Sequence, residues 1–272
     1  MLVTGSNPSS ISHMIETTDF RKSEQYTLSI RCTAGGFCFS LYNPLTSAEE
    51  AYSNYFVEAD ILLSECGNLK KIIRQTEWLN NSFGKVNVLF ENTRQMTIPL
   101  DFFEDEQAEE FFYHSFHKMD NEIVGYNVVS NNNIVVLYGM DQSTKAFLQE
   151  KYPNAKFYSK TTALLNHYGK KKGIENHKQL IVHVGNSICT LMAYDEGRLL
   201  LSNTQTYTQQ SDIAFYSLAC WKSLNMNQEE DELHISGKLA NIEELLHILQ
   251  KYLQHVIIEE NTTDIDIKAF TQ

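Results

Sequence analysis

Two separate stretches of the chain begin with the same pattern of alternating apolar and polar positions. Each stretch predicts an apolar strand, a turn of small residues and a second alternating strand. The four predicted strands are residues 26–33, 37–43, 179–185 and 188–195. Gly35 and Gly36 predict a two-residue hairpin turn in the first pair. The doubled pattern indicates two related lobes.

The rest of the chain alternates between strand and helix periodicities. We expect further strands near 55–63 and at 85–91, 94–99, 123–129, 134–140, 155–159, 198–206, 232–236 and 256–258. We expect helices at 66–82, 142–152, 161–168, 209–224 and 240–254, and one that carries Phe111, Phe112, Phe116 and Met119. The tail after 258 is polar. This order predicts an α/β fold in which helices cover mixed sheets.

Composition changes between residues 169 and 178, where Gly, Lys, Asn and His dominate. We therefore predict a first lobe at 1–172, of which 1–24 is flexible, and a second lobe at 173–272. The length of 272 residues suits two lobes of this kind.

The net charge of −12 disfavours partners that carry phosphate backbones or anionic lipid. Lys170-Lys171-Lys172 reads as a solvated linker rather than a nucleic-acid site. No apolar run reaches the ~18 residues of a membrane span, and the N-terminus does not resemble a secretory signal. Five cysteines without a CxxC spacing fit reduced thiols, so we expect a cytoplasmic protein.

Common catalytic motifs are missing from the sequence. It contains no GxSxG elbow and no Walker-type phosphate loop. His114 and His117 have no third ligand nearby in the sequence, so we predict no metal site there. The acidic segment from Asp101 to Glu110 reads as a solvated helix start. The aromatic residues that surround it are expected to be core, with an exposed portion able to dock a partner protein.

The order of elements between residues 26 and 258 resembles the actin-like ATPase superfamily, and within it the FtsA-like and PilM-like proteins. The motifs that carry the likeness are the turn His183-Val184-Gly185-Asn186-Ser187, the Glu196-Gly197 turn, the segment Leu233–Leu245 and the run Ile134–Leu165. The chain is also similar to an uncharacterised bacterial family, a domain of unknown function with this fold. The resemblance implies two ribonuclease-H-like lobes, whose first hairpins approach nucleotide phosphates, and adenosine placed against the Gly237 segment.

Active members carry an aspartate in each first turn, which helps to hold Mg²⁺ beside the phosphates. By alignment, Arg31 and His183 take these two positions, and neither side chain attracts Mg²⁺. Thr33 also replaces the glycine of the first turn, which narrows the approach of a phosphate to the backbone. ATP hydrolysis by the mechanism of the superfamily is therefore not expected.

Two interpretations of the cleft remain open. In the first, the candidate residues form an interlobe site that binds an anion directly: Arg31, Gly35, Gly36, His183, Gly185, Asn186, Ser187 and Gly237. In the second, the glycines make ordinary turns, Arg31 pairs with a carboxylate and His183 packs on its strand. We favour the second.

The function expected from these features is a non-catalytic actin-like protein, a binding or scaffold module for a protein partner, with no cofactor and no metal. The alternative is a nucleotide-dependent ATPase or kinase that binds ATP through metal ligands outside the aligned positions. Candidates for such ligands are Asp195, Asp212 and Glu232.

Overall fold

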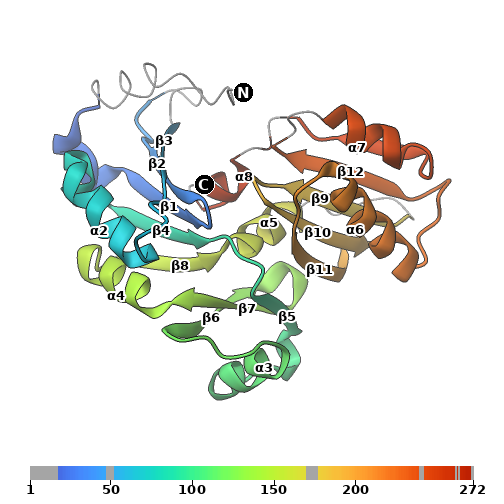
Figure 1. Cartoon of the computed structure of the whole chain (residues 1–272), viewed down its shortest axis with the longest axis horizontal. Coiled ribbons are helices and arrows are strands. Elements are labelled where there is room, and N and C mark those ends of the chain that lie inside the picture. The colour runs from blue at the N-terminus through green and yellow to red at the C-terminus, as the bar shows by residue number, and fades with distance from the viewer. Residues whose placement is uncertain are drawn as a thin grey trace.

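The computed structural model describes residues 18–46, 52–169, 177–238, 242–260, 262 and 264–270. Two lobes face each other across a central region (Figure 1). We call residues 18–169 the first lobe and residues 177–258 the second lobe. The expected change of lobe falls in 170–176, outside the described residues, as do 1–17 of the segment predicted to be flexible.

A five-stranded sheet forms the centre of the first lobe, in the order β3-β2-β1-β4-β8. Its strands are β1 (Thr27–Thr33), β2 (Gly36–Tyr42), β3 (Tyr52–Glu58), β4 (Lys85–Phe90) and β8 (Ala155–Ser159). The first three strands form an antiparallel meander, and β4 and β8 then add in parallel to β1. A smaller antiparallel sheet in the order β5-β7-β6 is inserted between β4 and β8; its strands are β5 (Gln95–Pro99), β6 (Glu122–Val129) and β7 (Ile134–Asp141).

The second lobe repeats the same plan in the order β11-β10-β9-β12-β13. Its strands are β9 (Gln179–Val184), β10 (Ile188–Asp195), β11 (Arg198–Thr206), β12 (Glu232–Gly237) and β13 (His255–Ile258). Again, three antiparallel strands are followed by two parallel ones. The doubling predicted from the hydrophobic pattern is confirmed, as is the mixed α/β class.

Helices cover both sheets. The α-helices are α2 (Glu65–Gln75), α3 (Ala108–Ser115), α4 (Gln142–Lys151), α5 (Lys160–Tyr168), α6 (Gln210–Ser223), α7 (Ile242–Leu249) and α8 (Ile265–Lys268). Short 3₁₀ helices are η1 (Phe20–Gln25), η2 (Glu77–Asn80), η3 (Leu100–Phe102), η4 (Asp105–Gln107) and η5 (Ser130–Asn132). Several α-helices begin at a side-chain cap; the carboxylate of Asp141, for example, accepts a hydrogen bond from the Thr144 amide.

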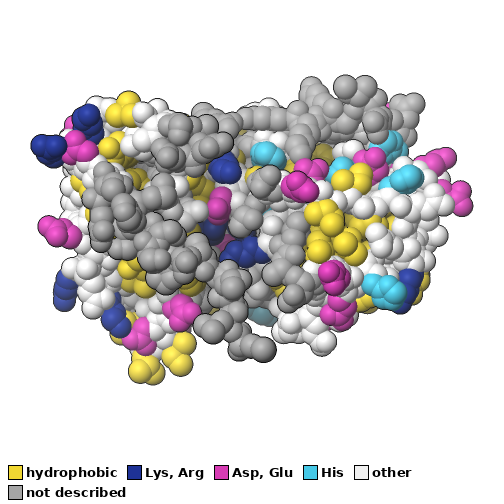
Figure 2. All heavy atoms as spheres, turned by 90° about the horizontal axis from the view of Figure 1, so that it is seen from above, with side chains coloured by type: hydrophobic (Ala, Val, Ile, Leu, Met, Phe, Trp, Pro, Cys, Tyr) yellow, Lys and Arg dark blue, Asp and Glu magenta, His cyan; other side chains and the backbone are white. Residues whose placement is uncertain are grey.

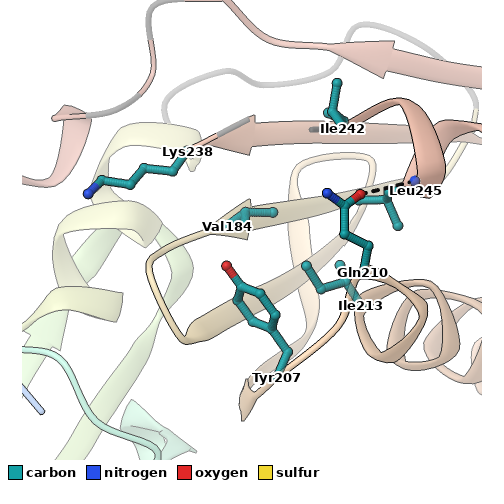
Figure 3. Close-up of a pocket in the computed structure, with 7 residues that line it drawn as sticks. All are labelled: Val184, Tyr207, Gln210, Ile213, Lys238, Ile242 and Leu245. Carbon is teal, nitrogen blue, oxygen red and sulfur yellow. Dashed lines mark hydrogen bonds between the residues drawn. The ribbon is translucent and has the colours of Figure 1, made fainter. Parts of the chain in front are cut away.

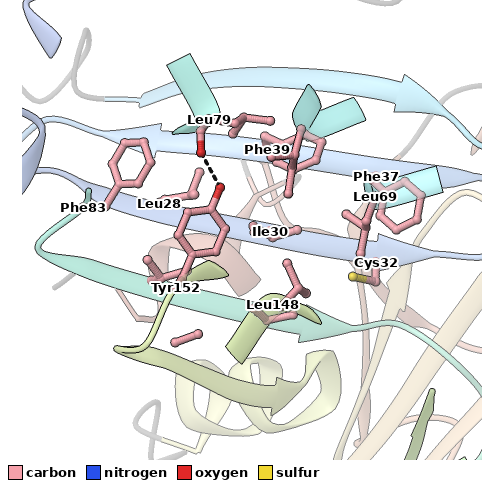
Figure 4. Close-up of a cluster of buried hydrophobic side chains, with 14 of the residues drawn as sticks. Leu28, Ile30, Cys32, Phe37, Phe39, Leu69, Leu79, Phe83, Leu148 and Tyr152 are labelled. Atoms are coloured by element: carbon pink, nitrogen blue, oxygen red, sulfur yellow. Dashed lines mark hydrogen bonds between the residues drawn. The ribbon is translucent and has the colours of Figure 1, made fainter. Parts of the chain in front are cut away.

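Each lobe has its own apolar core on the outer side of its sheet. In the first lobe, alternate strand residues such as Leu28, Ile30 and Phe39 pack against Leu69 of α2 and Leu148 of α4 (Figure 4). In the second lobe, the corresponding face packs against α6 and α7. Helices α5 and α8 lie between the lobes, on the other side of the sheets (Figure 1).

Some predicted boundaries were wrong. The first hairpin turns at Ala34 and Gly35, and Gly36 already belongs to β2, where its φ of +150° suits glycine. Strand β3 ends at Glu58 rather than near residue 63, and the helix predicted at 66–82 ends at Gln75, with η2 after it.

The polar tail also differs from the prediction, because part of it forms α8, whose Ile265 and Ile267 are buried. At the other end, the described part of the segment expected to be flexible contains η1, and Phe20 stacks on Trp78 with ring centroids 5.9 Å apart.

Candidate functional site

A polar cavity of about 200 Å³ lies at the junction of the two lobes. It is lined by the ends of β1–β4 from the first lobe, by the β9–β10 turn from the second, and by the residue before α8. The charged residues that line it are Arg31, Glu91, Lys160, Lys238 and Asp264. In a view onto the junction, basic and acidic side chains gather between the two halves (Figure 2). Arg31 and His183, which the sequence analysis assigned to a shared cleft, both line this cavity.

Arg31 of β1 is paired with carboxylates from the end of the chain. Its Nε and Nη2 atoms donate to Asp266 at 2.8 and 2.6 Å, and Nη2 donates to Asp264 at 3.2 Å. The Asp266 side chain is fully buried. Burial raises the pKa of Asp266, and the charges of Arg31 and Lys160 lower it to a net value of about 2. Arg31 is therefore held by a buried, ionised partner and is not free to neutralise a ligand.

His183 of β9 faces the same cavity but remains neutral. Its Nδ1 atom lies 3.1 Å from the Ser236 hydroxyl, and its side chain is almost completely buried. Burial, together with the charge of Lys160, lowers the pKa of His183 to about 3. The imidazole therefore carries no charge near neutral pH.

A second ion pair, within the first lobe, lies against the β9–β10 turn of the second lobe. Lys160, at the start of α5, donates to Glu91 at 2.6 Å, and both side chains are about nine-tenths buried. Gly185 lies against this pair, since a Cβ there would come within 2.6 Å of the Glu91 carboxylate. Tyr207 donates to the carbonyl of Gly185 at 2.7 Å and so fixes the turn. The turn thus packs on an ion pair of the first lobe.

Lys238 is the exposed cation of the site, and its Nζ donates to the side chain of Asn186 at 2.6 Å. Three cations, Arg31, Lys160 and Lys238, are matched by the carboxylates of Glu91, Asp264 and Asp266. The described charges of the site therefore balance, and the site offers no excess of positive charge for an anion.

Four of the eight predicted site residues line the cavity: Arg31, His183, Gly185 and Asn186. The other four, Gly35, Gly36, Ser187 and Gly237, are not among the lining residues described. Gly237 ends β12 with a φ of +91°, and a Cβ there would collide with the backbone of Val184. Its amide donates to the Thr262 hydroxyl at 2.7 Å. The positive φ and the close approach to the Val184 backbone account for this glycine without a ligand.

The structure also brings to the site five polar residues that the sequence did not single out: Asn54, Glu91, Lys160, Lys238 and Asp264. Ile265 and Ile267 alternate with Asp264 and Asp266, a period typical of a strand rather than a helix, so the local sequence gives no signal for α8. Cys38 also lines the cavity. Burial raises the pKa of its thiol to about 11, so it is not a nucleophile near neutral pH.

A smaller cavity of about 40 Å³ lies where the resemblance places adenosine (Figure 3). Lys238, Ile242 and Leu245 line it on one side, and Tyr207 and Gln210 on the other. The Gln210 side chain accepts a hydrogen bond from the Leu245 amide at 3.1 Å and so holds α7 against α6. This volume holds a few water molecules, whereas pockets for nucleotide-sized ligands usually exceed ~300 Å³.

The described residues do not fit Mg²⁺ and ATP. The cavity carboxylates Glu91 and Asp264 are already engaged by Lys160 and Arg31. Within the described residues, no cluster of three or more His, Cys, Asp or Glu side chains has metal-binding geometry. The alternative ligands Asp195, Asp212 and Glu232 are not among the described lining residues either. Asp212 instead accepts from the amides of Thr208 and Gln209 at the start of α6.

Two lobes with repeated topology around a central cavity define an actin-like ATPase fold. The sequence matches, over residues 15–256, the family described as "Protein of unknown function (DUF3822)", and the chain belongs to that family. A crystal structure from Bacteroides thetaiotaomicron, of a protein with actin-like ATPase fold and unknown function, is 40% identical with a TM-score of 0.85. The match covers 93% of this chain and 98% of that one.

More distant solved structures match this chain with lower sequence identity and lower TM-scores. The PilM–PilN type IV pilus biogenesis complex matches at 12% identity and a TM-score of 0.49, over 89% of this chain and 96% of that one. The ethanolamine utilization protein EutJ from Carboxydothermus hydrogenoformans matches at 8% identity and a TM-score of 0.46, over 97% and 98% of the two chains. At this level, neither structure says anything about the activity of this chain. None of the curated proteins matches the sequence. In the described residues, no helix is both long and apolar enough to span a membrane.

Proposed function

We propose that this protein is a non-catalytic actin-like protein that acts as a binding or scaffold module for a protein partner. The observation that carries the proposal is the pairing of Arg31 with Asp266 and Asp264. By the resemblance, Arg31 stands where active members carry a carboxylate that helps to hold Mg²⁺. A buried guanidinium with two carboxylates of its own chain replaces that metal ligand.

The second carboxylate position supports the same proposal. His183 is neutral, buried and bonded to Ser236, so it contributes no charge to a metal or to a phosphate. The Lys160–Glu91 pair and Gly185 bring the two lobes into contact beside it. Polar contacts between the lobes take the structural role that a bound nucleotide would otherwise have.

Thermal unfolding with Mg·ATP tests the proposal. A ligand that binds the native state raises the melting temperature by mass action. We expect millimolar Mg·ATP to leave the melting temperature unchanged, with Mg²⁺ alone and ATP with EDTA as controls. A shift that requires both Mg²⁺ and ATP would contradict the proposal and favour the ATPase or kinase alternative. A shift with ATP in EDTA would instead favour direct anion binding.

A further inference from the structure

Helices α5 and α8 occupy equivalent positions after the last strand of each lobe's central sheet, and each crosses to the other lobe. Helix α5 packs its apolar residues Leu164, Leu165 and Tyr168 in one cluster with Ile181 and Met192 of the second lobe. Helix α8 adds Ile265 to the same cluster, but Asp266 and the preceding Asp264 meet the first lobe through polar contacts. These two helices therefore offer an internal comparison between an apolar and a partly polar docking surface.

The contacts of the C-terminal segment with the first lobe are spread along its length. Besides the pair with Arg31, Asp264 accepts from the Asn54 side chain at 3.0 Å. Lys85 donates to the carbonyl of Phe270 at 2.6 Å, and the Phe270 ring stacks on Tyr158 with centroids 4.0 Å apart. Carboxylates at one end and an aromatic ring at the other hold this segment on the sheet.

Beneath α8, the sheet carries a row of polar side chains. Asn54, Ser40, Ser29 and Asn87 are successive partners across β3, β2, β1 and β4. Ser29 lies two positions from Arg31 and so points to the same face. Ser29, Ser40 and Asn87 are each at most 1% exposed.

Helix α8 does not supply hydrogen-bond partners for this row of polar side chains. The hydroxyls of Ser29 and Ser40, the Asn54 oxygen and both polar side-chain atoms of Asn87 have no hydrogen-bond partner in the described structure. Buried polar groups are normally paired, and leaving them unpaired weakens the contact that buries them. Ile267 is buried as well, yet it joins none of the apolar clusters of the described residues. The face under α8 therefore suits a more polar occupant than α8 itself.

We propose that the inner face of the first-lobe sheet is a binding groove for an acidic peptide segment. Helix α8 occupies the groove in cis, and a partner protein that carries such a segment displaces it. The chemistry required is a pair of carboxylates two residues apart for Arg31 and Asn54, followed by polar side chains that reach the Ser29–Asn87 row. Arginine binds carboxylates in this bidentate way better than other cations do. This inference rests on the proposed role as a binding module and names the groove and the class of partner.

A labelled peptide of residues 259–272 tests the groove in trans. The full-length variant with Asp264→Asn and Asp266→Asn loses the carboxylates that hold α8, so a larger fraction of the protein has an open groove. Because apparent affinity scales with that fraction, we expect the peptide to bind the variant at least ~10-fold more tightly than the wild type. A peptide with asparagine at both aspartate positions is the matched control and should not bind. Equal binding of the two peptides, or no binding to a folded variant, overturns the proposal.

Hydrogen exchange of the wild-type protein tests the same point if the variant does not fold. The amides of Lys268 and Ala269 bond to carbonyls of their own segment at 3.0 and 2.9 Å, as the amide of Gly169 does to Leu165 in α5 at 2.8 Å. We expect the α8 amides to exchange at least ~100-fold faster than those of α5, and faster again with excess peptide but not with its asparagine control. Equal protection of α5 and α8, unchanged by peptide, overturns the groove. The Mg·ATP measurement is independent of both outcomes.

Discussion

Gly185 and Glu91 lie on opposite lobes, and the Glu91 carboxylate fills the space into which a side chain on Gly185 would project. A Cβ at this glycine would be 2.6 Å from the carboxylate and 2.9 Å from the carbonyl of Ile188. The absence of a side chain lets the β9–β10 turn approach the Lys160–Glu91 pair. A glycine that the sequence assigned to a phosphate turn is thus also explained by contact between the lobes.

We expect Gly185→Ala to destabilise the protein by about 1–3 kcal/mol, the usual cost of overpacking. The methyl group must push away either the Glu91 carboxylate or the local backbone. Urea denaturation measures the effect. Gly35→Ala is the control, because nothing lies within 4 Å of its missing Cβ. Equal stability of the two variants would show that the turn does not press on the ion pair.

Replacement of Asp266 tests the buried pair with Arg31. We expect Asp266→Asn to cost about 3 kcal/mol near pH 7, since it leaves a buried charge with a weaker partner. The pKa of Asp266 is about 2, below its ordinary 3.8, so its stabilising charge is fully present above pH 4 and is lost as the pH falls through 2.

Urea denaturation at pH 7, 4 and 3 follows that contribution. The difference in free energy of unfolding between the wild type and Asp266→Asn should begin to decrease below pH 4. It should decrease by about 2 kcal/mol in total once the carboxylate is protonated. The exposed pair of Asp60 with Lys71 provides a control, and Asp60→Asn should have a much smaller effect. A gap that stays constant down to pH 3 would contradict a buried, ionised Asp266.

The lowered pKa of His183 predicts a second pH dependence, in a window closer to neutrality. Its pKa falls from 6.5 to about 3 on folding, so the unfolded chain binds a proton that the native protein excludes. The free energy of unfolding is therefore unaffected by this difference in pKa above pH 6.5, and it decreases as the pH falls from 6.5 towards 3. Between pH 7 and pH 5, the free energy of unfolding of the wild type should decrease by about 2 kcal/mol more than that of His183→Asn.

Urea denaturation at these two pH values measures that difference. The exposed His114→Asn variant controls for the loss of an imidazole without the loss of buried packing. A wild-type profile identical to that of His183→Asn would mean that His183 titrates alike in the folded and unfolded chains.

The first-lobe core contains one polar contact that can be removed cleanly. Tyr152 donates to the carbonyl of Leu79 at 2.6 Å inside the apolar cluster (Figure 4). We expect Tyr152→Phe to destabilise the protein by about 1 kcal/mol, because the buried carbonyl loses its partner. Tyr126→Phe, which removes an exposed hydrogen bond to Asp105, is the matched control and should change stability less. Thermal or urea unfolding that ranks the two variants in the opposite order would contradict this assignment.

Most of the secondary structure could be predicted from the sequence. Strands such as β7 and β10 and helices such as α4 and α6 lie within two residues of their predicted bounds. Each depends on local periodicity, which records which face of a segment is buried. The placement of Arg31 and His183 at the two carboxylate positions of the superfamily is implied by the resemblance and stays a prediction.

The partners of these residues came only from the tertiary structure. Arg31 meets Asp266 across 235 positions of the chain, and no local pattern records such a pairing. The neutrality of His183 follows from burial between the lobes, which its neighbours in sequence do not reveal. The crossing of α8 to the first lobe depends on how two complete sheets pack, because a short segment becomes helical and buried only where another surface receives it.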